Sequence, residues 1–214
     1  MKISTVVFDF DGTLVDSNAI KRQGFFDVVA DEPANNARMK TVLATVQGDR
    51  HSIFESYVAA CCASGIKGPD ADALVRRYSD LVDARVAVAP EMPGASQLLR
   101  GLQHAGLLVF ISSATPQANL TRIIERRRWR DSCNGIYGHP HRKSDTLRTI
   151  CAQLGVDICS IAVVGDGTDD IDSARAVGCS FFPVGEARGV TAGTKVFTLQ
   201  EVAEQLLSPH ATTY

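Results

Sequence analysis

Two carboxylates that are two residues apart, Asp9 and Asp11, follow directly after the apolar run of residues 6–8. Side chains two residues apart in an extended chain point the same way, and two carboxylates in a partly dry site repel each other unless a cation or a shared proton relieves them. The pair is therefore compatible with a divalent metal site, a nucleophile or a proton donor. A solvated turn is the alternative, because Asp and Gly are common turn residues.

Polar residues also follow two later apolar runs. Residues 107–111 lead into Ser112 and Ser113, and residues 161–164 lead to Asp166. In a parallel α/β sheet, ligands bind beyond the carboxyl ends of the strands, so we expect these residues to point into one crevice. Ordinary structural interpretations exist as well, because Ser and Thr cap helices and acidic residues favour the dipole of a helix whose first turn they occupy.

In order along the chain, four segments resemble the four signatures of the haloacid dehalogenase-like hydrolase superfamily. The first signature, Asp-x-Asp-Gly-Thr after a hydrophobic strand, matches residues 9–13 at every position. The second is a Ser or Thr at a strand tip, and the third is a lysine at the start of a helix, here Lys143, which by itself would be interpreted as a solvated side chain. The fourth, Gly-Asp-x-x-x-Asp, matches at Asp166 and Asp170.

The resemblance implies a role for each matching residue in cleaving a phosphate ester. Asp9 would be the nucleophile that forms an aspartyl phosphate, and Asp11 would act in turn as general acid and general base. Ser113 would donate a hydrogen bond to a phosphoryl oxygen, with Ser112 as the alternative if the register is shifted by one residue. Lys143 would neutralise the nucleophile and the phosphate together.

The resemblance also implies a Mg²⁺ cofactor and a set of residues that bind it and the substrate. The metal ligands would be the following: Asp9, the main-chain carbonyl of Asp11, Asp166 and Asp170. The substrate-binding residues would be Gly12, Thr13, Ser113, Ala114 and Lys143, joined by Arg50. Asp169 and Asp172 fall outside the fourth signature, and we interpret them as structural.

The organisation of the chain follows from where strand-like runs stop. From about residue 93 onward helical and strand patterns alternate, which predicts a parallel sheet with helices on both faces. We therefore predict an α/β fold with a doubly wound, Rossmann-like core of the haloacid dehalogenase type, made of residues 1–16 plus 91–214. Residues 17–90 show helical spacing and no strand-like run, which predicts an inserted α-helical cap domain that closes over the site.

The predicted cap contains one segment that could reach the substrate. In related capped phosphatases, a loop of the cap near the pattern Gly-x-x-Arg reaches the substrate. Here residues 46–52 lie between helical stretches and include Gly48, Arg50 and His51. Arginine presents a planar fork that suits a phosphate or a carboxylate, so we expect an anionic substrate group. An arginine on an exposed helix start explains the same residue equally well.

Composition and charge limit the classes of function. The chain has 214 residues, of which 45% are hydrophobic, and a formal net charge of −2, which gives no reason to invoke nucleic acid or an anionic membrane. We see neither a signal peptide nor an apolar run of about 20 residues that would cross a membrane, so we expect a cytoplasmic protein. Six cysteines without metal-like spacing are interpreted as reduced thiols.

An arginine-rich segment, residues 126–130, surrounds the single tryptophan. It could bind an anionic partner, but a basic patch is also favoured at the C-terminus of a helix. Given the near-neutral net charge, we interpret the segment as a basic helix C-terminus.

These observations predict a Mg²⁺-dependent phosphatase that acts on a small phosphorylated metabolite, similar to phosphoglycolate phosphatase or to enzymes of sugar phosphates. A phosphomutase of the same superfamily is one alternative. A non-catalytic member that binds a phosphorylated ligand is another, although such a binder needs neither a nucleophile nor an acid. The sequence leaves a monomer and a homodimer open.

Overall fold

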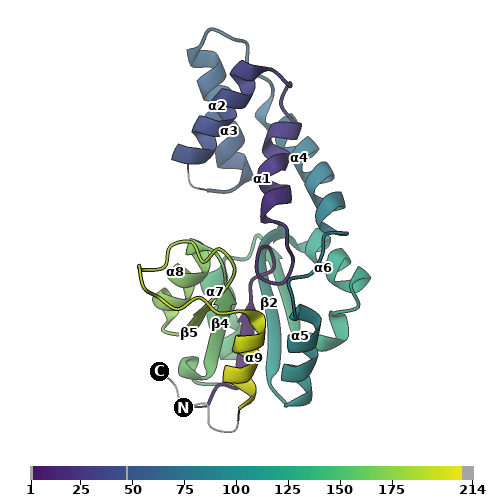
Figure 1. The fold of residues 1–214 in the computed structure, drawn as a ribbon, viewed down its shortest axis with the longest axis vertical. Helices are drawn as coiled ribbons and strands as arrows, with labels where there is room; N and C mark the ends of the chain where they lie inside the picture. Colours follow the sequence, from purple (N-terminus) through teal and green to yellow (C-terminus); the bar gives the residue numbers. More distant parts are fainter. Residues whose placement is uncertain (1, 47, 209–214) are drawn as a thin grey trace. The chain divides into compact units, whose positions relative to one another are not determined.

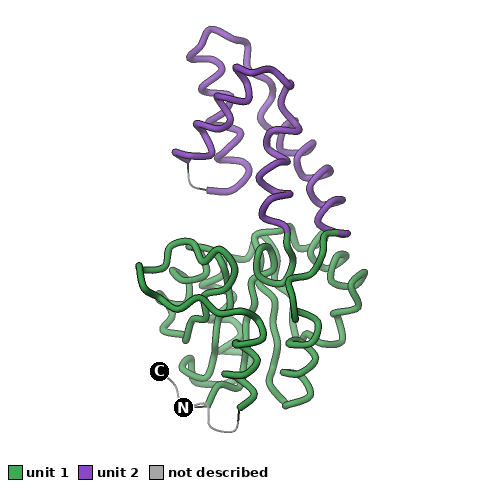
Figure 2. Tube along the Cα trace, viewed as in Figure 1, with its two compact units in different colours: residues 1–16, 89–214 green, residues 17–88 purple. Residues whose placement is uncertain are grey.

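The computed structural model describes residues 2–46 and 48–208. Its Cα trace divides into two compact units, which Figure 2 shows in different colours: unit 1 comprises residues 1–16 and 89–214, and unit 2 comprises residues 17–88. The second boundary lies two residues before the one expected from sequence.

Unit 1 contains a five-stranded parallel sheet in the order β3-β2-β1-β4-β5 (Figure 1). The strands are β1 (Thr5–Phe8), β2 (Leu108–Pro116), β3 (Gly135–His139), β4 (Ile161–Gly165) and β5 (Ser180–Pro183). β1 is buried along its whole length, as expected for a central strand covered on both faces. The structure confirms the predicted α/β class.

Helices cover both faces of this sheet. They are α5 (Ala95–His104), α6 (Gln117–Arg126), α7 (Lys143–Leu154), α8 (Thr168–Val177) and α9 (Leu199–Leu207). On one face Val7, Phe110 and Val163 stand in register on adjacent strands and pack with Leu147 of α7 and Ala174 of α8. Right-handed crossovers place α5 and α6 on the opposite face, where α9 contacts α5.

Unit 2 is built from four helices. They are α1 (Asn18–Asp27), α2 (Pro33–Thr45), α3 (Arg50–Ala63) and α4 (Ala71–Val86). An aromatic cluster of Phe25, Phe54 and Tyr78 joins α1, α3 and α4, and the rings of Phe25 and Tyr78 stack with their centroids 4.4 Å apart. Gly24 lets α1 approach α4, because a Cβ atom there would lie 2.4 Å from Val82 Cγ2.

The helix α2 carries the weakest sequence signal in unit 2. Only Met39 and Val42 of its residues are buried, so it lacks the broad apolar stripe that marks an amphipathic helix. Pro33 at its first position favours helix initiation. Within residues 17–90, the sequence shows apolar residues at helical spacing in 25–29, 53–58 and 73–82, which lie in or beside α1, α3 and α4, and it shows no such stretch at α2.

The arginine-rich segment lies at the C-terminal end of α6, as expected from the sequence, and it also makes internal contacts. Trp129 is buried, and its Nε1 donates to Ser96 Oγ at 2.8 Å. Arg127 is half-buried, lies over the Trp129 ring with 5.4 Å to its centroid, and donates to the carbonyl oxygen of Ala89. The end of α6 therefore also forms an internal contact with the chain that leaves unit 2.

The structure bears on the cysteines and on the length and apolar character of the helices. The thiols of all six cysteines are free. Among the helices of residues 2–46 and 48–208, none is both long enough and apolar enough to cross a membrane.

Candidate active site

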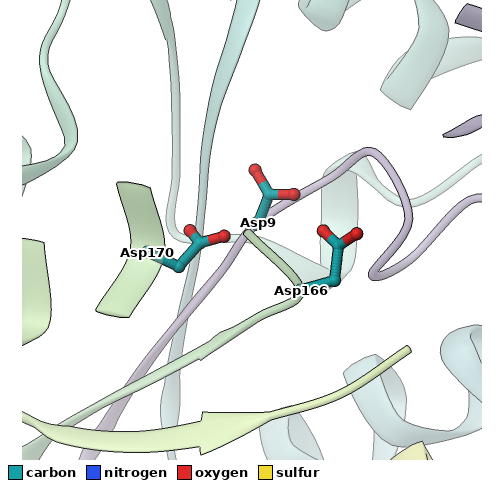
Figure 3. Close-up of side chains that lie close together, drawn as sticks. All are labelled: Asp9, Asp166 and Asp170. Atoms are coloured by element: carbon teal, nitrogen blue, oxygen red, sulfur yellow. The ribbon is translucent and has the colours of Figure 1, made fainter. Parts of the chain in front are cut away.

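Three buried carboxylates lie together at the carboxyl ends of β1 and β4 (Figure 3). Asp9 follows β1, Asp166 follows β4, and Asp170 stands in the first turn of α8. One carboxylate oxygen from each residue lies within 4.8 Å of the others. The backbone N–H of Asp9 donates to Val164 O at 2.9 Å, so the pairing of β1 with β4 continues up to the residue that carries the first carboxylate.

Lys143 brings a positive charge to this cluster. It is the first residue of α7, and its Nζ donates to Asp9 Oδ1 at 2.8 Å and to Asp170 Oδ1 at 2.6 Å. Its side chain is 12% exposed. The exposed carboxylate of Asp169, interpreted as structural from the sequence, lies 3.8 Å from the same nitrogen. Lys143 is therefore a buried ion-pair partner and not a solvated side chain.

Asp170 uses both of its carboxylate oxygens inside the protein. Oδ1 accepts from Lys143, and Oδ2 accepts the backbone N–H of Gly167 at 3.1 Å. A Cβ atom at Gly165 would lie 2.3 Å from Asp170 Cγ. The glycine at the end of β4 thus allows Asp170 to reach Lys143.

Asp166 is contacted from two loops. Its Oδ1 accepts a hydrogen bond of 3.3 Å from Thr13 Oγ1, and Arg188 Nη2 lies 3.8 Å from its Oδ2. The backbone N–H of Arg188 also donates to Asp166 O at 2.8 Å. Arg188 was missed by the sequence analysis, and only its place beyond the carboxyl end of β5 could have drawn attention to it. Gly185 lets this loop approach, because a Cβ atom there would lie 2.7 Å from Gly12 O.

Asp11 faces two hydroxyl groups of β2. Its Oδ2 accepts from Ser113 Oγ at 3.3 Å and from Thr115 Oγ1 at 3.0 Å. Ser112 points elsewhere, and its buried Oγ has no hydrogen-bond partner among the described residues. Of the two serines considered from sequence, Ser113 is therefore the one beside Asp11, and Thr115 is an additional contact that the sequence analysis did not identify.

The remaining predicted substrate-binding residues of unit 1 lie around these side chains. The side chain of Thr13 is buried against Asp166, whereas Ala114 is exposed between the buried residues Ser113 and Thr115. The backbone N–H of Gly12 donates to Val15 O at 2.8 Å. In this structure the Gly12 amide is therefore engaged within its own turn.

Arg50 of unit 2 is engaged in contacts inside that unit. It is the first residue of α3, and its Nη1 donates to Ser79 Oγ at 2.7 Å while its guanidinium lies over the Tyr78 ring. The preceding Asp49 caps α3 by accepting the N–H of Ser52. Gln47, which belongs to the same predicted segment, lies outside the described residues.

The electrostatics of the cluster leave it short of positive charge. Burial raises the pKa of Asp9 to about 8; Lys143 opposes this shift, while the nearby carboxylates of Asp170, Asp166 and Asp11 add to it. Burial likewise raises the pKa of Asp170, against Lys143. Burial would lower the pKa of Lys143, but Asp9 and Asp170 outweigh it and raise that pKa.

The donor set suits a hard divalent cation. Mg²⁺ prefers oxygen ligands and takes one or two protein carboxylates together with water and substrate oxygens. Asp9, Asp166 and Asp170 offer buried carboxylate oxygens at one place, and Lys143 together with the exposed Arg188 does not balance their charge. Asp9 and Asp166 are the better candidates for direct contact, since both oxygens of Asp170 already accept hydrogen bonds.

Comparison with known proteins gives one matching family and several relatives. The model of the haloacid dehalogenase-like hydrolase family matches residues 6–184. A phosphoglycolate phosphatase of Chromobacterium violaceum is 29% identical over 206 residues, covering 86% of this chain and 85% of the relative. An N-acetylmuramic acid 6-phosphate phosphatase of Pseudomonas aeruginosa is 27% identical over 188 residues, covering 83% of this chain and 80% of the relative.

A solved structure supports the fold. The HAD-hydrolase YfnB of Bacillus subtilis, described as bound to magnesium, superimposes with a TM-score of 0.75 at 13% identity. The superposition covers 97% of this chain and all of that one, at 100%. At this identity the likeness concerns the fold alone.

Proposed function

The chain belongs to the haloacid dehalogenase-like hydrolase family and is a phosphatase of that family, and on that premise we propose that it hydrolyses a small phosphorylated metabolite through an aspartyl phosphate on Asp9. The observation that carries the proposal is the pairing, at one end of the sheet, of a buried carboxylate held by Lys143 with a second carboxylate held by hydroxyl groups. A nucleophile and a separate acid are what a two-step hydrolysis requires.

In the first step an oxygen of Asp9 attacks phosphorus. The bond from phosphorus to the ester oxygen breaks, and Asp11 gives its proton to the departing oxygen, so that the alcohol leaves neutral. Lys143 lies 2.8 Å from Asp9 Oδ1, where it orients the nucleophile and offsets phosphoryl charge. Ser113 would turn its hydroxyl from Asp11 to a phosphoryl oxygen.

In the second step water attacks the phosphorus of the aspartyl phosphate. Asp11, now a carboxylate, takes a proton from the water, and the bond between phosphorus and the Asp9 oxygen breaks to release phosphate. Asp9 and Asp11 thereby return to their starting states. This cycle explains why two carboxylates with different partners stand after one strand.

Three groups of the site would hold Mg²⁺: Asp9, Asp166 and the main-chain carbonyl of Asp11. When bound, the cation would neutralise phosphoryl charge and fix the orientation of the phosphoryl group. Asp170 would act mainly by holding Lys143, since its oxygens accept from Lys143 and Gly167. Thr13 would orient Asp166 through its hydroxyl.

The substrate proposal rests on the relatives and on unit 2. The relatives are named for phosphoglycolate and for N-acetylmuramic acid 6-phosphate, both of which are small phosphate esters. We propose that unit 2 is the cap that selects the organic part of such an ester and excludes water.

The test is phosphate release from a panel of small phosphate esters, 2-phosphoglycolate and sugar phosphates included, with Mg²⁺ or with EDTA. We expect metal-dependent release that Asp9→Asn reduces to background while its circular dichroism spectrum stays that of the wild type. Asp172→Asn, which changes an exposed carboxylate outside the cluster, is the matched control and keeps wild-type activity. Full activity of Asp9→Asn would refute the proposed mechanism, and conversion of a sugar phosphate to an isomer without phosphate release would indicate a mutase.

A further inference from the structure

Thr115 makes the shortest hydrogen bond from β2 to Asp11. Its Oγ1 lies 3.0 Å from Asp11 Oδ2, against 3.3 Å for Ser113 Oγ on the same oxygen. Both residues are buried, and both hydroxyl groups donate to the same oxygen, although the pairing of β2 with β3 is irregular between Ser112 and Pro116. Two hydroxyl groups from one strand therefore converge on one oxygen of the proposed acid and base.

The hydroxyl groups of Ser113 and Thr115 differ in the hydrogen bonds that they must make while substrate is bound. Ser113 Oγ accepts the backbone N–H of Thr115 at 3.0 Å, and a hydroxyl has a single proton to donate. Once that proton turns to a phosphoryl oxygen, as the proposed function requires, the bond from Ser113 to Asp11 is lost. Thr115 can keep its bond to Asp11 while substrate is bound.

Thr115 is also confined. Its side chain is 2% exposed, and its backbone N–H is held by Ser113 Oγ at 3.0 Å, beyond the part of β2 that pairs with β1. A β-branched side chain has few χ1 choices, whereas the last torsion of an Asp side chain is broad and roughly two-fold. A fixed donor beside Asp11 therefore determines which carboxylate oxygen faces away from β2.

We propose, building on the function proposed above, that Thr115 is a positioning residue that holds Oδ2 of Asp11 so that the proton is exchanged at Oδ1. The hydroxyl of Thr115 donates to Oδ2 whether Asp11 carries the proton on Oδ1 or has given it away. The same contact thus serves the first step, in which Oδ1 gives its proton to the departing oxygen, and the second, in which Oδ1 takes a proton from water.

The test uses phenyl phosphates whose leaving groups differ in basicity and little in shape, from p-nitrophenyl phosphate to unsubstituted phenyl phosphate. A weakly basic leaving group departs without a proton, whereas a strongly basic one needs the acid. Thr115→Val removes the hydroxyl and keeps the shape of the side chain. We expect a loss in kcat/KM, which reports the steps up to departure of the leaving group, of about tenfold to a hundredfold for phenyl phosphate, the scale of a misplaced catalytic group. We expect little loss in kcat/KM for p-nitrophenyl phosphate.

Two variants separate positioning from packing. Thr115→Ser retains a hydroxyl and should restore most of the activity towards phenyl phosphate. Thr5→Val is the matched control, because Thr5 is a buried strand threonine whose Oγ1 has no hydrogen-bond partner among the described residues. It should leave the dependence on leaving group unchanged. If Thr115→Val does not fold, Thr115→Ala replaces it in the same comparison.

The outcomes are distinct. In an Asp11→Asn background, Thr115→Val should have no further effect on phenyl phosphate, since the proton transfer is already lost. Equal losses in kcat/KM on both esters, or no loss on either, would overturn the role of Thr115 while leaving the phosphatase intact. Failure of the wild type to release phosphate from any ester would instead overturn the proposed function, and this inference with it.

Discussion

At the scale of single residues, the site holds more buried negative than positive charge. Asp9, Asp166 and Asp170 are buried together, and Lys143 pairs with two of them. Burying a carboxylate favours its neutral form unless an opposite charge compensates. The raised pKa of Asp9, about 8, expresses this deficit of positive charge, which a divalent cation would remove.

This deficit predicts how stability depends on pH and metal. A carboxyl group with a pKa of about 8 in the folded chain and an ordinary value of 3.8 when unfolded binds its proton more tightly when folded. The free energy of unfolding of the metal-free protein therefore falls as pH rises from about 4 to about 8. Mg²⁺ at about 100 times its Kd would add about 2.7 kcal/mol, and more of that gain should be visible at pH 8 than at pH 5.5.

The measurement is the difference in Tm between Mg²⁺ and EDTA at the two pH values. The difference should be larger at pH 8, because protons no longer compete for Asp9. Asp9→Asn should shrink the difference and flatten its dependence on pH. A difference that is equal at both pH values in the wild type would contradict a raised pKa of Asp9.

At the scale of elements, short distances between strand ends and helix starts bring the charges together. β4 ends at Gly165, α8 begins at Thr168, and the carboxylate of Asp170 packs directly on Gly165. After the neighbouring strand β1, the chain turns at Gly12, and the hydroxyl of Thr13 then donates to Asp166. The helix α7 supplies Lys143 from its first position. Each charged group thus comes from the end of an element, where the backbone is fixed by the sheet.

A methyl group at Gly165 tests this arrangement. The new Cβ atom would lie 2.3 Å from Asp170 Cγ, so Asp170 must move and its bond to Lys143 is disturbed. We expect Gly165→Ala to lower Tm, with an overpacking cost of about 1–3 kcal/mol, and to abolish most phosphatase activity. Both are measured by thermal unfolding and phosphate release.

The matched control for that substitution is Gly101→Ala in α5. A Cβ atom there meets only Leu207 Cδ1, at 3.4 Å, and alanine is favoured over glycine in a helix by about 1 kcal/mol. This variant should keep its activity and be as stable as the wild type or more so. Wild-type activity of Gly165→Ala would show that Asp170 has room to move without consequence.

At the scale of the whole molecule, the chain leaves and re-enters unit 1 through two paired linkers. Asp16 N–H donates to Pro90 O at 3.0 Å, and Met92 N–H donates to Leu14 O at 2.9 Å. Arg127 fastens the second linker by donating to Ala89 O while its guanidinium lies over Trp129. The proposed catalytic residues all belong to unit 1, so unit 2 would act by selection and closure.

Removing the Arg127 side chain tests the anchoring of the linker. Arg127→Ala loses a hydrogen bond from a charged group and a cation–π contact, which together are worth about 1–3 kcal/mol, so its Tm should fall. Arg126→Ala, at an exposed position one residue earlier, should stay within about 0.5 kcal/mol of the wild type. Equal Tm values for the two variants would show that Arg127 does not anchor the linker.

The sequence alone determined the parts of this protein that depend on local patterns. Apolar runs followed by carboxylates marked β1 and β4, because strand periods repeat within a few residues, and the resemblance to the family's fourth signature marked Asp166 and Asp170. The alternation after residue 93 was enough for the α/β class. α2 was missed for the same reason, since a helix that buries only Met39 and Val42 has little periodic signal.

Only the tertiary structure decided which distant side chains meet. The bond from Thr115 to Asp11, the approach of Arg188 to Asp166 and the contact of Arg127 with Ala89 join residues far apart in the chain. Their residue types are common on surfaces and at helix ends, so no local pattern singles them out. Partners at such separations are set by the order of strands in the sheet and by the loops beyond their carboxyl ends, and these positions exist only once the chain has folded.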